Sequence, residues 1–327
     1  MERERSQPLL PFVSPMRMSN KPGYVVGIDA GGTSVRVVLA DKATGQVRAE
    51  TSGPASPDGG ADALASLWKQ VGISPGDASV LGMCAGITKW TRAGVRPQWE
   101  TYLHEAFPHA NVALVPDYVT AFHGAVPSGI GAVVIAGTGS VVYGANANGD
   151  TVRVGGRGWD FGDEGSGAWL TTEAVKRTLR ALDGLEPMSP LTYAVCDALG
   201  TQNPDLIGEA ARRQIEQSGR GFLVPRILEL AQTGDADAAN LFVGAAGWLY
   251  AYVKAALAQL GLHDPTQPVT VATVGGMWEA GDLILSPFRA TLARHFPHAN
   301  VAPPDAPPVI GAVRLCLAQP SQQSSVL

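Results

Sequence analysis

Short apolar, β-branched runs separated by glycine-rich polar turns open the ordered part of this chain. Residues 24–29 form one such run, the turn 31–34 follows, and a second run covers residues 35–40. The same design returns later, where the runs 132–136 and 141–144 flank another glycine turn. Apolar runs of this length, bounded by glycine and polar residues, predict strands joined by tight turns. We therefore expect two strand–turn–strand units in comparable positions.

A repeated hexapeptide strengthens this interpretation. The sequence Phe-Pro-His-Ala-Asn-Val occurs at residues 107–112 and again at 296–301, each time after a segment with helical spacing of apolar residues. Such self-similarity indicates an internal duplication. We expect two related α/β domains, one formed by residues 20–128 and the other by residues 129–306. Residues 307–327, with a helix over 308–318, are expected to return to the first domain.

Two further segments complete the predicted organisation. Residues 1–19 are charged and then rich in proline without sustained periodicity, so we expect a flexible tail. A helical insertion is expected over residues 173–262, and apolar residues recur there at helical spacing from Asp237 to Leu260. This spacing predicts a buried core helix. Lys254 and Gln259 interrupt its most apolar part, which argues against a membrane span.

Composition excludes several classes of protein. The chain has 327 residues, a net charge of −5 and no run of Lys and Arg, so we expect no nucleic-acid partner. Its length and 45% hydrophobic content suit a globular protein of about two domains. Cys84, Cys196 and Cys316 are far apart in the sequence and form no C-x-x-C motif. They are typical of reduced thiols in a cytoplasmic protein and do not indicate a metal site.

The two glycine turns are candidates for phosphate binding. Tight glycine turns expose backbone N–H groups that bind anions. The chain contains neither the P-loop sequence nor a G-x-G-x-x-G motif opening a helix. Matched turns in duplicated domains predict instead a phosphate clamp made by two hairpins. Asp117 follows the predicted strand 112–115 between these turns, where its carboxylate can accept a proton or cap the next helix.

Longer segments carry a resemblance to a known family. The segments DAGGTSVRVVLAD and IAGTGSVVYGANANGD, with GGRGWDFGDEGSGAWL at residues 155–170, resemble the acetate and sugar kinase, Hsp70 and actin superfamily. Within it, the chain resembles the BadF/BadG/BcrA/BcrD ATPase family, above all its N-acetylglucosamine and glucosamine kinases. The resemblance implies an α/β fold of two RNase H-like domains, as in the actin-like ATPases, around a central ATP cleft.

The resemblance also implies roles for individual residues. Asp29 would hold Mg²⁺, although a carboxylate at a strand end can also serve only as a turn former. Asp117 would be the catalytic base. The ATP-binding residues would be Gly31, Gly32, Thr33, Ser34, Gly137, Thr138, Gly139, Ser140, Gly275 and Gly276. The last two follow the predicted strand 269–274 and would let adenosine lie against backbone. Asp305, at the position equivalent to Asp117, is expected only to cap a helix.

The sugar-binding residues implied by the resemblance are Ser56, Gly156, Asp163 and Glu164. Carboxylates suit sugar hydroxyl groups because each hydroxyl can donate a hydrogen bond. The alternative for Asp163 and Glu164 is that they only place charge at a helix N-terminus. We expect three nearby aromatic residues to pack beneath this loop: Trp159, Phe161 and Trp169. The segment 89–92 is expected to be a surface loop near the cleft.

Three departures from the family pattern leave the acceptor open. Arg157 stands where animal N-acetylglucosamine kinases have Trp, Val141 stands where they have Asn, and Ser56 replaces an Asn that contacts sugar. Loss of two amides weakens the case for the N-acetyl group. The sequence therefore predicts an ATP- and Mg²⁺-dependent kinase acting on the 6-hydroxyl of N-acetyl-D-glucosamine or D-glucosamine.

Two other functions remain as alternatives. An activator ATPase of the same family would need cysteines that hold an iron–sulfur cluster, and the spacing of the three cysteines does not suit one. A non-catalytic sugar-sensing protein would carry a DNA-binding domain, for which the residues before Tyr24 are too few. The expected partners are a small amino sugar and ATP, with no membrane partner. A homodimer is expected because it is the commonest closed assembly.

Overall fold

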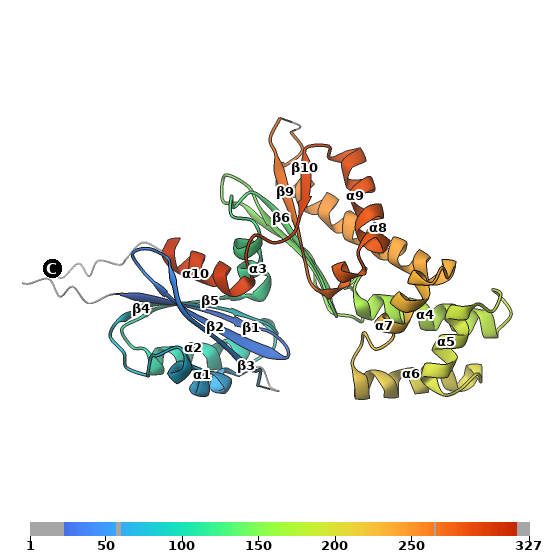
Figure 1. The fold of residues 1–327 in the computed structure, drawn as a ribbon, viewed down its shortest axis with the longest axis horizontal. Helices are drawn as coiled ribbons and strands as arrows, with labels where there is room; N and C mark the ends of the chain where they lie inside the picture. The colour runs from blue at the N-terminus through green and yellow to red at the C-terminus, as the bar shows by residue number, and fades with distance from the viewer. Residues whose placement is uncertain (1–22, 57–59, 265, 319–327) are drawn as a thin grey trace, which may run out of the picture.

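The computed structural model describes residues 23–56, 60–264 and 266–318, which form two mixed five-stranded sheets with helices packed against them (Figure 1). The predicted α/β class is therefore confirmed. The predicted tail over residues 1–19 lies outside the described residues. The boundaries proposed for the two domains stay a prediction.

The two sheets share one topology. In each sheet the first three strands form an antiparallel meander, and two later strands join parallel to the first. In spatial order, the first sheet contains β3 (Val47–Pro54), β2 (Ser34–Asp41), β1 (Tyr24–Ala30), β4 (Val80–Ile87) and β5 (Asn111–Pro116). The second sheet contains β8 (Thr151–Gly155), β7 (Ser140–Ala145), β6 (Gly131–Ala136), β9 (Val269–Val274) and β10 (Ala299–Ala302). This equivalence is what an internal duplication produces.

Helices cover both faces of the first sheet. On one face, α1 (Ala65–Gln70) and α2 (Val95–Ala106) bury Trp68 and Trp99 against the strands. On the other face lies α10 (Pro308–Ala318), the last described helix. It lies so close to β1 that a Cβ on Gly27 would be 2.5 Å from the carbonyl oxygen of Val309. The chain therefore returns to its first sheet at the end.

Helix α3 (Asp117–Ala125) joins the two parts of the molecule (Figure 1). Phe122 packs into an apolar cluster with Val133 and Ala272 of the second sheet. On its other side α3 touches α10, where a Cβ on Gly311 would be 1.9 Å from the carbonyl oxygen of Thr120. The first residue of this shared helix is Asp117, so the fold places its carboxylate where the two parts meet.

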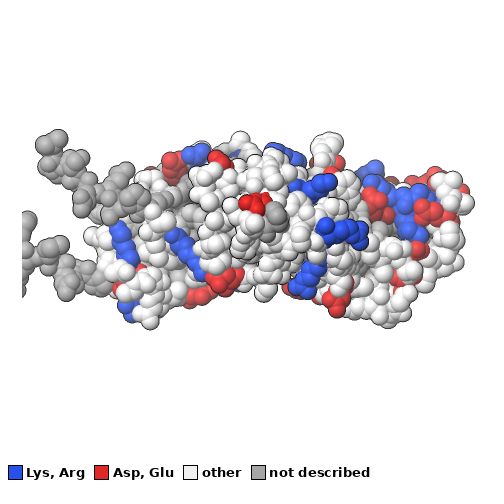
Figure 2. All heavy atoms as spheres, turned by 90° about the horizontal axis from the view of Figure 1, so that it is seen from above, with Lys and Arg blue, Asp and Glu red and all other residues white. Residues whose placement is uncertain are grey.

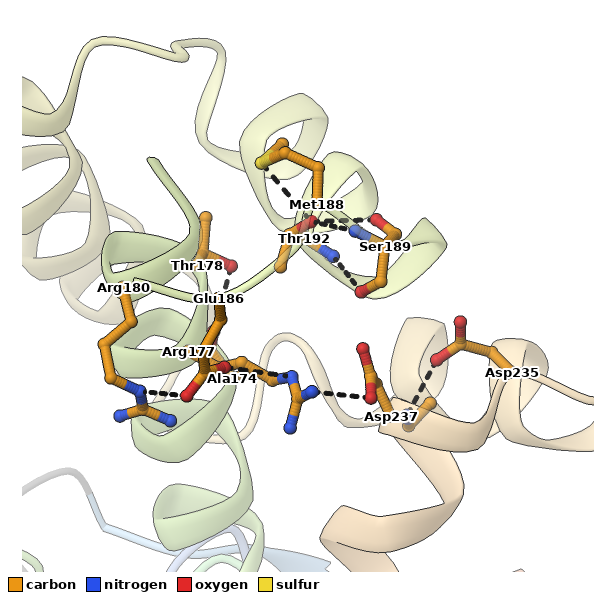
Figure 3. A network of polar contacts seen from close by, with 11 residues as sticks. Ala174, Arg177, Thr178, Arg180, Glu186, Met188, Ser189, Thr192, Asp235 and Asp237 are labelled. Atoms are coloured by element: carbon orange, nitrogen blue, oxygen red, sulfur yellow. Dashed lines mark hydrogen bonds and ion pairs between the residues drawn. The ribbon is translucent and has the colours of Figure 1, made fainter. Parts of the chain in front are cut away.

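Five helices stand between β8 and β9, where the helical insertion was predicted. They are α4 (Gly167–Leu182), α5 (Pro190–Leu199), α6 (Pro204–Ser218), α7 (Val224–Gln232) and α8 (Ala236–Gln259). Figure 3 shows ion pairs that fasten them: Arg177 joins α4 to Asp237 of α8 at 2.6 Å. Arg180 pairs with Glu186 at 2.6 Å, and a capping box of Ser189 and Thr192 starts α5.

Helix α8 is the core helix predicted from the apolar spacing. Phe242, Leu249 and Val253 are buried in the cluster that also contains the second sheet. Among the described residues, α8 alone is long and apolar enough to cross a membrane by length and composition, a test that core helices also pass. The short helix η2 (Gly276–Ala280) and α9 (Asp282–His295) complete this part, as η1 (Ala61–Leu64) completes the first.

On the face that Figure 2 shows, charged side chains form separate patches, and the patches of Lys and Arg are divided by other residues and form no continuous band. This distribution is in keeping with the net charge of −5.

Candidate active site

A cavity of about 760 Å³ opens between the two sheets. Its walls come from residues 88–91 after β4, the start of α3, the turn 137–141, Arg153 of β8, and a loop that contributes residues 156–158 and Asp163. Seven predicted site residues line it: Asp117, Gly137, Thr138, Gly139, Ser140, Gly156 and Asp163. The cavity thus joins groups from both parts of the chain.

Asp117 lies at the inner wall of this cavity. It is the first residue of α3, and its Oδ1 accepts a hydrogen bond from the Tyr118 backbone N–H at 2.8 Å. Burial raises the pKa of Asp117, although hydrogen bonds from Tyr118 and from the Thr88 side chain partly oppose the rise. A carboxylate with a raised pKa is a stronger proton acceptor than an exposed one.

Asp29 lies on β1, which β4 separates from β5, and it is close enough to Asp117 for the charge of that residue to act on it. Burial raises its pKa to about 6, the charge of Asp117 adds to the rise, and Arg36 opposes it. Asp29 and Asp117 are both buried, and the charge of Asp117 disfavours ionisation of Asp29. Carboxylates of this kind offer the hard oxygen ligands that Mg²⁺ prefers. The residues present therefore fit a magnesium ion.

The first glycine turn lies beside the main cavity. Gly31 and Ser56 line a small adjoining pocket together with Thr88, which borders both spaces. Gly32, Thr33 and Ser34 are exposed at the tip of the hairpin between β1 and β2. The first turn therefore stands next to Asp29 and Asp117 but does not form the wall of the main cavity.

The second glycine turn forms that wall directly. The first amides of α4 donate to it, Gly167 to the Gly137 carbonyl at 2.8 Å and Ala168 to the Thr138 carbonyl at 3.1 Å. The buried Ser140 hydroxyl donates to the backbone carbonyl of Glu164 at 2.8 Å. Ser140 was predicted to bind phosphate, and here its hydroxyl fastens the turn to the neighbouring loop.

That neighbouring loop, residues 155–166, presents Asp163 to the cavity. Asp163 has a φ of 58°, and Lys89 on the opposite wall has a φ of 54°; among the described residues they alone are non-glycine residues with positive φ. Such strained conformations concentrate at functional sites. Burial raises the pKa of Asp163, while backbone N–H groups of Ser140 and Gly158 hydrogen-bond to its carboxylate.

Glu164 faces away from the cavity. Its carboxylate accepts a hydrogen bond from the Tyr252 hydroxyl on α8, and its backbone N–H donates to the same oxygen at 3.3 Å. Glu164 was predicted as a sugar ligand together with Asp163. The structure brings only Asp163 to the cavity.

Gly275 and Gly276, the predicted adenosine residues, follow β9 outside the lining of the main cavity. Gly275 has a φ of 106°, and a Cβ there would lie 2.4 Å from the carbonyl oxygen of Ala136. A side chain at this position would collide with the strand that leads into the second glycine turn. The close packing explains the glycine without reference to a ligand.

The prediction that Trp159 and Phe161 pack beneath the loop was wrong. The Phe161 side chain is 92% exposed and Trp159 is 41% exposed, with the Arg220 guanidinium 4.9 Å from the Trp159 ring. Trp169 is partly buried and packs against the helical core. The cysteines are all buried and free, and the described residues hold no group of three metal-ligating side chains from His, Cys, Asp and Glu.

Sequence reasoning assigned no role to several lining residues: Thr88, Lys89, Trp90, Thr91, Tyr118 and Arg153. The Arg153 guanidinium lies 5.6 Å from the centre of the Tyr118 ring. A topological signal was available for residues 88–91, because they follow β4, the parallel neighbour of β1. Loops at the carboxyl ends of neighbouring parallel strands form binding crevices. The segment 89–92 was predicted to lie near the cleft, but no function was assigned to it.

Comparisons with known proteins agree with this architecture. Residues 26–314 match the sequence profile of the BadF/BadG/BcrA/BcrD ATPase family. An N-acetyl-D-glucosamine kinase of Dictyostelium discoideum is 26% identical over 311 residues, covering 89% of this chain and 97% of the relative. A glucosamine kinase of Vibrio cholerae is 30% identical over 226 residues, 67% of this chain and 75% of that enzyme. A crystal structure from Chromobacterium violaceum, solved as a candidate N-acetylglucosamine kinase, has a TM-score of 0.70 and 27% identity over 90% of this chain and 99% of its own.

Proposed function

Because this chain belongs to the BadF/BadG/BcrA/BcrD ATPase family, we propose that it is an ATP-dependent hexosamine kinase. The transferred group would be the γ-phosphoryl group of ATP, and the acceptor the 6-hydroxyl of N-acetyl-D-glucosamine or D-glucosamine. The observation that carries the proposal is the position of Asp117, which lines one cavity with the Gly137–Ser140 turn and with Asp163.

Asp117 would act as the general base. Its carboxylate would accept the proton of the sugar hydroxyl while that oxygen attacks phosphorus, and a positioned base contributes about 10²–10⁴-fold to such a rate. Burial favours this role because it raises the pKa of Asp117. Backbone amides of the glycine turns would surround the phosphates, which need positioning and charge stabilisation more than covalent chemistry.

Asp29, with Asp117 beside it, would hold Mg²⁺. When bound, the ion would neutralise charge on the β- and γ-phosphate oxygens. On the acceptor side, Asp163 would receive hydrogen bonds from sugar hydroxyls. Gly31, Gly32, Thr33 and Ser34 remain our assignment for the first phosphate turn, because that turn adjoins Asp29.

The charges of the cavity favour an acetylated acceptor. Three basic residues line the cavity, Lys89, Arg153 and Arg157, and two acidic ones, Asp117 and Asp163. Glucosamine carries an ammonium group near neutral pH, and two like charges a few ångströms apart repel by about 1 kcal/mol or more. N-acetylation removes that charge. We expect Arg157→Ala to raise kcat/KM for glucosamine relative to N-acetylglucosamine about 5-fold or more, and a fall in this ratio would contradict the argument.

A coupled ADP-release assay tests the proposed function. The acceptors are N-acetylglucosamine, glucosamine, N-acetylmannosamine and glucose, each with ATP and Mg²⁺. We expect turnover with a hexosamine, and turnover below about one tenth of wild type for Asp117→Asn with ATP binding retained. Release of ADP that is independent of every sugar would refute the proposal. A higher residual activity of the Asn variant would refute the role of Asp117 alone.

We also propose that the enzyme is a cytoplasmic homodimer. Three free, buried cysteines suit a reducing compartment. Exposed apolar side chains on the helical insertion, among them Tyr193, Leu206, Val243 and Trp248, provide surface for a second copy. Light scattering of the purified protein measures the assembly directly, and a monomer at all concentrations would refute it.

A further inference from the structure

Helix α8 lies directly beneath the loop 155–166 and touches it at both ends. A Cβ on Gly155 would be 2.3 Å from the Tyr252 ring, and a Cβ on Gly165 would be 2.7 Å from the Ala245 carbonyl oxygen. Both glycines have positive φ, 74° and 79°. At these two ends the backbone of the loop therefore lies against α8 with no room for a side chain between them.

Glu164 is held at three points within this contact. The Tyr252 hydroxyl donates to its carboxylate and accepts from its backbone N–H at 3.3 Å. The Ser140 hydroxyl donates to its backbone carbonyl at 2.8 Å. One residue thus links α8, the glycine turn that was assigned to phosphate, and the loop that carries Asp163.

Asp163 needs such support. Its positive φ of 58° is costly for a residue with a side chain, and it persists only where the surroundings enforce it. The next residue along the chain is Glu164, whose main chain is fixed on both sides. A hydrogen bond to a charged group is stronger than one between neutral groups.

We propose that Tyr252 is a positioning residue, which through Glu164 fixes Asp163 in the conformation that receives the acceptor sugar. The assignment of Glu164 changes with it: this carboxylate is a structural partner of Tyr252 and does not bind the sugar. The part of the inference that concerns acceptor binding rests on the proposed function. The support of the loop by α8 does not.

Tyr252→Phe tests the inference because it removes only the hydroxyl and keeps the ring beneath Gly155. Tyr250→Phe is the matched control: it lies on the same helix, and its buried hydroxyl has no hydrogen-bond partner among the described residues. Hydrogen exchange of the amides in 155–166 is measured for both. We expect at least 10-fold faster exchange in Tyr252→Phe and unchanged exchange in Tyr250→Phe. Equal exchange in the two variants would overturn the inference.

Kinetics supply the second readout. In Tyr252→Phe we expect kcat/KM for the sugar to fall about 10- to 100-fold, the usual loss for a hydrogen bond to a charged group. The KM for ATP should stay within 2-fold. If Tyr252 had only a structural role, the substitution would lower the amount of active enzyme, and the kinetic parameters for ATP and for the sugar would change equally. Equal losses for ATP and sugar would therefore overturn the positioning role.

A double-mutant cycle with Glu164→Ala identifies the partner. If Tyr252 acts mainly through the Glu164 carboxylate, the double variant is about as active as the less active of the two single variants. Losses that multiply would overturn this route. The protein could also prove to phosphorylate no hexosamine while amide exchange in residues 155–166 is faster in Tyr252→Phe. That result would support the role of Tyr252 in holding the loop and would refute the proposed function.

Discussion

Replacing Asp29 by Asn should stabilise the empty protein at neutral pH. The pKa of Asp29 rises from 3.8 to about 6 because the group is buried and faces Asp117. At about 1.36 kcal/mol per pKa unit, its ionised form costs the folded state about 3 kcal/mol. Asn fills the same space without the charge. For a domain of 150–250 residues this difference corresponds to a Tm higher by about 6–12 °C.

The pH dependence gives the prediction its sign. A carboxylate whose pKa is raised by folding stabilises the native state below its unfolded pKa and loses that contribution as the pH rises through about 6. The Tm advantage of Asp29→Asn over wild type should therefore be small near pH 4 and full above pH 7. Calorimetry at several pH values, without nucleotide or Mg²⁺, measures the difference.

Asp41 supplies the matched control on the same hairpin. Hydrogen bonds from Thr44, with further ones from Arg48 and Ala43, lower the pKa of this partly buried carboxylate. Its contribution is present above the unfolded pKa and is lost as the pH falls, so Asp41→Asn should lower the Tm above pH 4. An Asp29→Asn advantage that is equal at pH 4 and pH 7.5, or a lower Tm at pH 7.5, would refute the reasoning. Addition of Mg²⁺ with an ATP analogue should raise the Tm of wild type but not of Asp29→Asn.

Three further substitutions have defined outcomes. Gly311→Ala should destabilise the protein by about 3 kcal/mol in denaturant unfolding, because its Cβ would be 1.9 Å from the backbone oxygen of Thr120; an unchanged midpoint would contradict the close packing. Gly139→Ala would bring its Cβ to 2.7 Å from Asp163 Oδ2, so the KM for the sugar should rise about 10-fold or more. An unaltered KM would contradict the proposal that Asp163 binds the sugar. Phe161→Ala should change the free energy of unfolding by less than about 0.5 kcal/mol, since the ring is 92% exposed; a larger loss would mean that the ring is buried in solution.

The repeated hexapeptide predicted the two related α/β parts of the fold because its two copies adopt the same local backbone conformation. Phe107 ends α2 with φ −135° and ψ 73°, and Phe296 ends α9 with φ −134° and ψ 71°. Both rings are buried. Apolar periodicity predicted α8, and the repeat predicted α10, each within a residue or two. By contrast, four strands were not predicted: β3, β4, β8 and β10. Three of them, β3, β8 and β10, are outer strands of their sheets with few buried apolar side chains, whereas β4 is central and mostly buried.

The site was less accessible to sequence reasoning than the fold. Asp163 and Glu164 are adjacent carboxylates with equal chemical suitability, and the sequence pattern does not separate them. The choice depends on the φ of Asp163 and on Tyr252, which is 88 residues away from Glu164. The exposed rings of Trp159 and Phe161 show the same difficulty, because burial of a loop residue is decided by tertiary contacts. The roles assigned to the site residues stay predictions.

The duplicated halves also show how one position acquired two different uses. Asp117 follows the hexapeptide at residues 107–112 and starts the helix between the two sheets, where burial keeps its pKa high. Asp305 follows the copy at residues 296–301, but its carboxylate pairs with Arg314 of α10 at 2.5 Å. Arg314 also donates to the backbone carbonyls of His123 and Gly124 at the end of α3. Asp305 thus helps to hold α10 against α3, the helix that begins with Asp117. Asp305 does not line the cavity, but through Arg314 it supports the helix that places Asp117 there.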